Sequence, residues 1–397
     1  MARTTWLLGP VLALALLPSN VVATALPLLR EEWAASATEM GWVFAAYQVG
    51  YVAAVLLVLP LTDRVPTGRV IAASSLAVSL AFLLFPLLAQ GVWSAALLRA
   101  LAGVGLAGVY MPGVRLVAQA ATPERRGLAV SVYVSAFYLG AAISLWGTGA
   151  LLAPIGWRGA ALVLGLISVA AAPLAVLATR RAAAPEGKTA RPRPEVLRHG
   201  PLLRTILAYT GHSWELYVSR GWLAAFLAAV LATEGLGSVE AAAEGGKWAA
   251  LMAGLGTVGV WLGGWLSDRW GRARAALAIA AASGVISLGF GWLGAAGWWL
   301  LVVVGCLYSL LVAADSGVYS TAVAELAPSD QLGSAQAAQA FLGFTATALA
   351  PVAAGLVLDL GGGYGGAFML AGVVGLAGAF ALVPLARQGR SVEVRTT

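Results

Sequence analysis

Charge is scarce in this chain of 397 residues, of which 10% are charged and 60% are hydrophobic. Soluble domains carry about 25% charged residues, so this composition excludes a soluble protein. The single cysteine, Cys306, excludes an intrachain disulfide and a multi-cysteine metal site. The sequence has two histidines and lacks paired carboxylates at catalytic spacing, HExxH, G-x-S-x-G and P-loop motifs. These absences disfavour an enzyme, and we expect neither a cofactor nor a metal.

What the sequence does contain is a series of apolar runs of about 20 residues, the length at which an α-helix crosses a bilayer. The runs lack the alternation of barrel strands, so we expect an all-α polytopic membrane protein with twelve transmembrane helices. The predicted spans are 6–29, 39–61, 69–89, 93–118, 127–152, 158–178, 202–231, 246–267, 274–295, 297–321, 332–358 and 365–386. The first run also fits a secretory signal peptide, but its removal would leave eleven spans.

Basic residues gather on one side of the predicted membrane. If the N-terminus is cytoplasmic, eighteen lysine and arginine residues fall in cytoplasmic segments and three fall on the opposite side. The positive-inside rule therefore predicts that both termini are cytoplasmic, and we expect a bacterial or archaeal cytoplasmic membrane. The same placement accounts for the net charge of +7 without a nucleic-acid partner.

A short motif occurs twice, with an offset of 205 residues from Asp63 to Asp268. Leu-Thr-Asp-Arg at 61–64 follows the second span, and Leu-Ser-Asp-Arg at 266–269 follows the eighth. A polar, proline-rich stretch lies between the sixth and seventh spans. This duplication predicts two six-helix halves, at 1–180 and 201–397, joined by a cytoplasmic linker at 181–200.

The second copy, from Gly264 to Arg272, closely matches the loop motif G-x-x-x-D-R-x-G-R, and through it the chain resembles the major facilitator superfamily over essentially its whole length. The first copy departs from that motif, with Leu59 in place of the glycine and two extra residues before Gly68. The resemblance implies two pseudo-symmetric six-helix bundles that rock about a central cavity. It also implies a conformational latch on the cytoplasmic side, made by Asp63, Arg64, Asp268, Arg269 and Arg272.

Weaker matches to the same family are Arg99-x-x-x-Gly103-x-Gly105 in span 4 and Gly156-Trp157-Arg158 before span 6. Span 5 lacks the proline of the motif that is found in many drug antiporters of the family. The absence of this proline makes a drug-exporting antiporter a less favoured function for this chain.

Ionisable residues well inside the membrane all lie in spans 4, 7 and 10: Arg99, Arg115, His212, Glu215, Arg220 and Asp315. Spans 3, 6, 9 and 12, which the resemblance places outside the cavity, contain no Asp, Glu, Lys, Arg or His after their first positions. In span 7 an arc of about 160° contains Tyr209, His212, Glu215, Ser219, Arg220 and Trp222, so this face is expected to line the cavity. Intramembrane charges are costly and usually functional, but each has a structural alternative, such as snorkelling for Arg115 or helix pairing for Arg99.

A carboxyl group removed from water holds its proton more tightly, and histidine titrates near neutrality. We therefore expect Glu215, His212 and Asp315 to couple protons. Three buried arginines against two buried acids slightly favour an anionic solute. The expected substrate contacts are Arg220, Arg115, Arg99, Asn20, Tyr47, Gln48, Tyr133, Tyr138, Tyr308, Gln336 and Gln339.

These features predict a monomeric secondary transporter that moves a small, anionic organic or inorganic solute by proton-coupled alternating access, in contact with membrane lipid. The alternative is a proton-coupled antiporter that exports amphipathic or drug-like compounds, in which Glu215 or Asp315 binds cations and Arg220 is structural. A transporter-like sensor would need an appended soluble domain or a long tail, which this sequence does not show.

Overall fold

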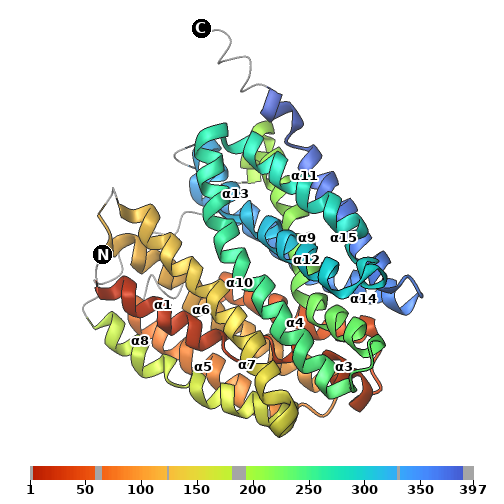
Figure 1. Cartoon of the computed structure of the whole chain (residues 1–397). Helices are drawn as coiled ribbons and strands as arrows, with labels where there is room; N and C mark the ends of the chain where they lie inside the picture. Colours follow the sequence, from red (N-terminus) through yellow and green to blue (C-terminus); the bar gives the residue numbers. More distant parts are fainter. Residues whose placement is uncertain (1–2, 59–64, 123–124, 181–193, 329–330, 388–397) are drawn as a thin grey trace. The chain divides into compact units, whose positions relative to one another are not determined.

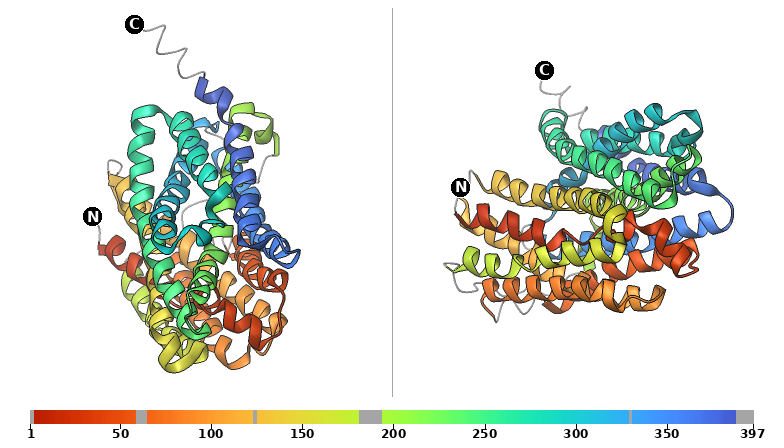
Figure 2. Two further views of the ribbon diagram at one scale, coloured as in Figure 1. Left: turned by 45° about the vertical axis from the view of Figure 1, so that its right-hand side comes forward. Right: turned by 60° about the horizontal axis from the view of Figure 1, so that its bottom comes forward.

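The computed structural model describes residues 3–58, 65–122, 125–180, 194–328 and 331–387. Within these ranges every regular element is a helix, which confirms the predicted all-α class. Nine helical stretches among the described residues are long and apolar enough to cross a membrane. Contacts divide the chain into two compact units, here called unit 1 (1–189 and 223–251) and unit 2 (190–222 and 252–397). Figures 1 and 2 show the helices of both units.

In unit 1, the predicted first span is broken into three helices rather than one. These are α1 (Arg3–Leu16), α2 (Val21–Thr24) and α3 (Leu26–Glu32). The chain continues through α4 (Ala37–Val58), α5 (Thr67–Leu88), α6 (Val92–Ala120), α7 (Arg126–Ser168) and α8 (Ala171–Thr179). Here α4 and α5 pack on α6, and α1 packs on α7 and α8.

Predicted span 5 continues into predicted span 6 within α7, with no loop between them. The chain kinks inside α7 at Gly156, whose φ of 68° and ψ of 175° are not helical. Glycine tolerates this positive φ because it has no Cβ atom. The Gly-Trp-Arg motif therefore marks the turn between two helical spans, and the remainder of span 6 is supplied by α8.

Unit 2 takes its helices from the second half of the chain. They are the first part of α9 (Gly200–Thr233), the last part of α10 (Ser238–Trp270), α11 (Arg272–Phe290), α12 (Trp298–Ala314), α13 (Ser316–Leu326), α14 (Leu332–Asp359) and α15 (Gly363–Phe380), with the short 3₁₀ helices η3 (Pro194–Arg198) and η4 (Leu293–Ala296). Predicted span 10 is interrupted at Asp315, which separates α12 from α13. In this unit α11 packs on α12, α13 and α15.

The twelve predicted spans are consistent with this order of helices. Residues 223–251 group by contact with unit 1, so the compact units are not identical to the predicted halves. The division at 180 and 201 stays a prediction. Residues 181–193 of the expected linker lie outside the described residues.

A polar contact in unit 1 ties the end of α3 to the kink in α7. Glu32 accepts a hydrogen bond of 2.7 Å from Trp157 Nε1 and pairs at 2.7 Å with Arg158 Nη2. The Arg158 guanidinium also lies 4.3 Å from the centre of the Trp157 ring. The hydrogen bond from Arg158 holds the pKa of the Glu32 carboxyl below its ordinary value, so the group stays ionised at neutral pH.

Glycine allows the same helix pair to approach closely in both repeats. In unit 1, a Cβ atom on Gly50 or Gly103 would collide with backbone carbonyl oxygens across the α4–α6 contact. In unit 2, a Cβ atom on Gly259 or Gly263 would collide with backbone carbonyl oxygens of α12. Small residues four apart are a common means of bringing two membrane helices into backbone contact. Spans 2 and 4 are thus in close backbone contact, and so are spans 8 and 10.

The neighbouring glycines Gly263 and Gly264 test this contact. We expect Gly263→Ala to destabilise the protein by about 1–3 kcal/mol, because the added methyl group meets the Ala314 carbonyl oxygen, which cannot rotate away. Gly264 has open space at its Cβ position, so Gly264→Ala should be neutral or slightly stabilising. Thermal unfolding of both variants in detergent measures the difference. Equal unfolding temperatures would contradict the close α10–α12 contact.

Candidate functional site

The interior of unit 2 brings together three ionisable side chains. His212 on α9 places Nδ1 2.8 Å from Asp315 Oδ1, and these side chains are 4% and 2% exposed. The other ring nitrogen, Nε2, lies 3.0 Å from Ser316 Oγ. Both polar sites of the imidazole therefore face a polar group, and the His212–Asp315 contact becomes an ion pair when the imidazole is protonated.

Glu215 lies almost one helical turn further along α9 and is 1% exposed. Its Oε2 accepts a hydrogen bond of 3.3 Å from Ser283 Oγ on α11 and lies directly against Gly375 on α15. Its Oε1 has no hydrogen-bond partner among the described residues. Asp315 and Tyr308 are near enough to interact with it electrostatically. The three predicted proton-coupling residues are thus one buried cluster.

The direction of Glu215 differs from the expected one. The polar face of span 7 is predicted to line a central cavity, whereas the Glu215 carboxyl points to α11 and α15. These two helices are the predicted spans 9 and 12, which the resemblance places outside. An arc of about 160° is wide enough to face several neighbouring helices, so sequence spacing alone does not fix which helix a side chain meets.

In unit 1, polar groups of α6 and α7 meet the break in span 1. Arg99 on α6 donates a hydrogen bond of 2.6 Å from Nη1 to the Ser19 carbonyl oxygen. The backbone N–H of Asn20 donates one of 2.9 Å to Ser144 Oγ. The Arg99 guanidinium also lies 4.5 Å from the centre of the Tyr47 ring, and its side chain is buried. This geometry favours the structural alternative for Arg99, in which it holds two helices together.

Two of the residues that were predicted to contact substrate are tyrosines. The hydroxyl group of each contacts a partner within the same unit. Tyr133 donates a hydrogen bond of 3.1 Å to the Val109 carbonyl oxygen within unit 1. Tyr308 lies 3.2 Å from Ser287 Oγ, with its ring 5.0 Å from that of Phe290, within unit 2. Both side chains are fully buried. Each therefore contributes to the packing of its own unit.

The remaining predicted contacts are spread over several helices. Tyr138, Gln48 and Gln339 are buried, and Gln336 is exposed. Arg115 and Arg220 are half-buried, with the Arg220 guanidinium 5.3 Å from the centre of the Tyr217 ring. The substrate roles of all these residues stay predictions. No group of described residues could hold a metal ion.

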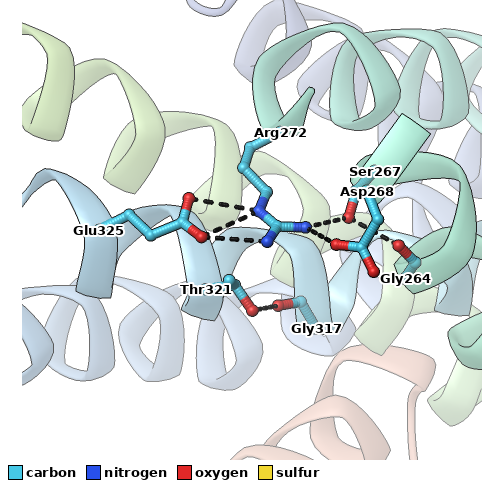
Figure 3. A network of polar contacts seen from close by, with 7 residues as sticks. All are labelled: Gly264, Ser267, Asp268, Arg272, Gly317, Thr321 and Glu325. Atoms are coloured by element: carbon cyan, nitrogen blue, oxygen red, sulfur yellow. Dashed lines mark hydrogen bonds and ion pairs between the residues drawn. The ribbon is translucent and has the colours of Figure 1, made fainter. Parts of the chain in front are cut away.

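The second copy of the repeated motif forms a charged network within unit 2, shown in Figure 3. Arg272 donates from Nη1 to Ser267 Oγ at 2.8 Å and contacts the Asp268 carboxylate through the same nitrogen. Its Nη2 lies 3.0 Å from Glu325 Oε1, and its Nε lies 3.2 Å from both Glu325 oxygens. The network joins the end of α10, the start of α11 and the end of α13.

The predicted latch residues do not all belong to this network. The Arg269 guanidinium lies 4.0 Å from the centre of the Trp265 ring instead. Asp63 and Arg64, from the first copy, lie outside the described residues. Glu325 was not predicted, because it is 53 residues from Arg272 and no motif or periodicity marks it. Ser283 and Ser316 were missed for the same reason.

A family model described as Major Facilitator Superfamily matches residues 8–314 and, in a second alignment, residues 243–396. The chain belongs to the Major Facilitator Superfamily. It is therefore an integral membrane transporter rather than an enzyme.

Within the superfamily, the chain is 24% identical over 400 residues to the hexuronate transporter of Bacillus subtilis, an alignment that covers 94% of this chain and 91% of that protein. It is 28% identical over 208 residues to the probable sulfoacetate transporter SauU of Cupriavidus necator, covering 52% of this chain and 48% of that protein. The second alignment thus spans about half of each protein. Both relatives are named for transport of organic anions.

The fold is also that of solved superfamily structures. A bacterial homologue of the human lysosomal transporter Spinster, in an inward-facing and unoccupied conformation, aligns with a TM-score of 0.69 at 16% identity. The alignment covers 97% of this chain and 95% of the other. This similarity confirms the predicted superfamily fold.

The network at Arg272 can be tested with a double-mutant cycle. We expect Arg272→Gln and Glu325→Gln to show a coupling of about 0.5–1 kcal/mol in unfolding free energy, because the two side chains are in contact but partly exposed. Chemical unfolding in detergent measures the cycle. The control cycle combines Arg272→Gln with Glu240→Gln, at the far end of α10. The effects of these two substitutions on the unfolding free energy should be additive. A coupling near zero for Arg272 and Glu325 would contradict the network.

Proposed function

We propose that this transporter moves a small organic anion by alternating access and couples the movement to protons. The observation that carries this proposal is the buried cluster of His212, Asp315 and Glu215, because it can hold protons away from water. The anionic solutes named for two relatives support the choice of substrate class.

The cluster supports proton coupling because an ionised side chain in the interior of unit 2 has a free-energy cost that a neutral one does not have. A carboxylate at Glu215 would be almost fully buried, with Oε1 lacking a hydrogen-bond partner among the described residues, and burial of a poorly compensated charge costs several kcal/mol. Glu215 and Asp315 also interact electrostatically, so ionisation of both is unfavourable. Protonation of Glu215 removes this cost, and His212 can accept or release a proton beside Asp315. We propose that protonation of the cluster changes the energy of the surrounding helix contacts and so couples proton binding to the conformation of the unit.

An anionic substrate fits the arginines of the predicted cavity spans. Arg99 is buried and bonds the Ser19 carbonyl oxygen, and Arg115 and Arg220 are half-buried. A guanidinium group binds a carboxylate or sulfonate through two parallel hydrogen bonds. We assign substrate recognition to Arg220, with Arg115 as a second contact.

In the proposed cycle, the two predicted halves, 1–180 and 201–397, rock about a substrate site near the middle of the bilayer. The positive-inside asymmetry supports cytoplasmic termini in a bacterial or archaeal cytoplasmic membrane. We propose that the transporter works as a monomer.

Proteoliposomes with an imposed pH gradient test the coupling. A thermal-shift screen first compares glucuronate, sulfoacetate and other small organic anions with amphipathic cations. We expect an anion to stabilise the protein and to accumulate in response to the gradient. Glu215→Gln should abolish gradient-driven accumulation, because the amide cannot release a proton, while anion exchange at equal pH continues.

The matched control is Glu234→Gln, an exposed glutamate just beyond the end of α9, which should transport like the unmodified protein. Uptake that ignores the pH gradient would overturn proton coupling. Stabilisation by amphipathic cations and by no anion would overturn the substrate class.

Arg220→Lys tests anion recognition separately from coupling. Lysine keeps the charge but loses the planar fork, so we expect the KM for the anion found in the screen to rise by about tenfold with little change in unfolding temperature. Arg204→Lys, at an exposed position on the same helix, is the control. An unchanged KM in Arg220→Lys would remove Arg220 from the substrate site.

A further inference from the structure

A groove on unit 2 lies beside the charged network, but Arg272 does not line it. Its volume is about 580 Å³, and it lies between the end of α10, the first turns of α11 and the segment that follows α15. Its lining residues are Arg269, Trp270, Arg274, Leu277, Ala278, Ala281, Val383, Ala386 and Arg387. The two arginines of the repeated motif thus have different surroundings, since Arg272 contacts acids while Arg269 lines this groove.

The groove is strongly cationic. Arg269, Arg274 and Arg387 line it, and no acidic residue is among its lining residues. Arg274 is fixed by a hydrogen bond of 3.2 Å from Nε to the Ala386 carbonyl oxygen, which ties α11 to the segment after α15. The nearby acid, Asp268, contacts Arg272. Three guanidinium groups that line one groove provide many donors for a phosphate.

The rest of the groove is apolar. Leu277, Ala278, Ala281 and Val383 continue the lining along α11 and the segment after α15. Trp270, whose side chain is 52% exposed, is a residue type enriched where a membrane meets water. A small, fully hydrated anion would leave this apolar part unused. A molecule with a charged head and a hydrocarbon tail would fill both parts.

We propose that this groove binds the headgroup of an anionic phospholipid. The phosphate oxygens accept hydrogen bonds from Arg269, Arg274 and Arg387, and the first part of an acyl chain lies along Leu277 and Ala281. The sequence places this end of α10 and α11 on the cytoplasmic side, where anionic lipids give the leaflet a negative surface potential. Because Arg269 is adjacent to Asp268, a bound lipid would hold the same turn that presents Asp268 to Arg272.

Native mass spectrometry of the full chain in detergent tests the site with dioleoyl phosphatidylglycerol, and with phosphatidylcholine as the neutral comparison. We expect selective retention of phosphatidylglycerol. The apparent affinity should fall roughly fivefold for each arginine replaced in Arg269→Gln, Arg274→Gln and Arg387→Gln. The double variant Arg269→Gln/Arg387→Gln keeps the Arg274–Ala386 hydrogen bond and changes only exposed side chains, so it tests the site even if the triple variant unfolds.

The control replaces Arg69, Arg198 and Arg204 with glutamine, which removes the same charge from exposed positions on the same predicted side. It should retain phosphatidylglycerol like the unmodified protein. An equal loss in the control would mean diffuse charge attraction and would overturn the site. Inorganic phosphate and glycerol 3-phosphate should not displace the lipid at millimolar concentration. Displacement by either would mean that the groove recognises phosphate alone, which would overturn the lipid as its occupant.

Discussion

Burial of an ionisable side chain among apolar helices is costly unless another helix supplies a polar partner. Both units of this transporter meet that constraint across helices. In unit 1, Arg99 bonds the Ser19 carbonyl oxygen at the break of span 1. In unit 2, His212 lies beside Asp315, and Glu215 bonds Ser283. Each charged group is therefore part of a helix–helix contact, so a change in its protonation or partner acts directly on packing.

The helix α13 connects two of these polar contacts in unit 2. Asp315, beside His212, immediately precedes its first residue, and Glu325, which pairs with Arg272, lies near its last. The neighbouring helix α10 passes close to the α12–α13 junction at Gly263 and then presents Asp268 to Arg272. A helix of eleven residues is about 16 Å long and moves as a stiff rod. The helix α13 thus extends from the buried cluster at one end to the Arg272 network at the other.

Much of the fold was predictable because it depends on local composition. Long apolar runs define the spans, and the second copy of the motif lies at the α10–α11 turn, where Asp268 and Arg272 are in contact. His212, Glu215 and Asp315 were each singled out because charge inside a span is rare, but the contact between Asp315 and His212 was not predicted. The contacts at the break of span 1 were not predicted either, because sequence spacing does not reveal that Arg99 and Ser144 will meet the freed backbone groups.

By itself, the sequence determined the class of protein, the order of the spans, the repeat and the small set of intramembrane ionisable residues. These features follow from hydropathy and charge, which are properties of each residue type and do not depend on where the residue lies in the fold. Only the tertiary structure decided that Glu215 points to α11 and α15, that Arg272 pairs with Glu325 and that Arg269 lines a separate groove. A helix presents side chains in all directions, and which neighbour each one meets depends on packing between segments far apart in the chain.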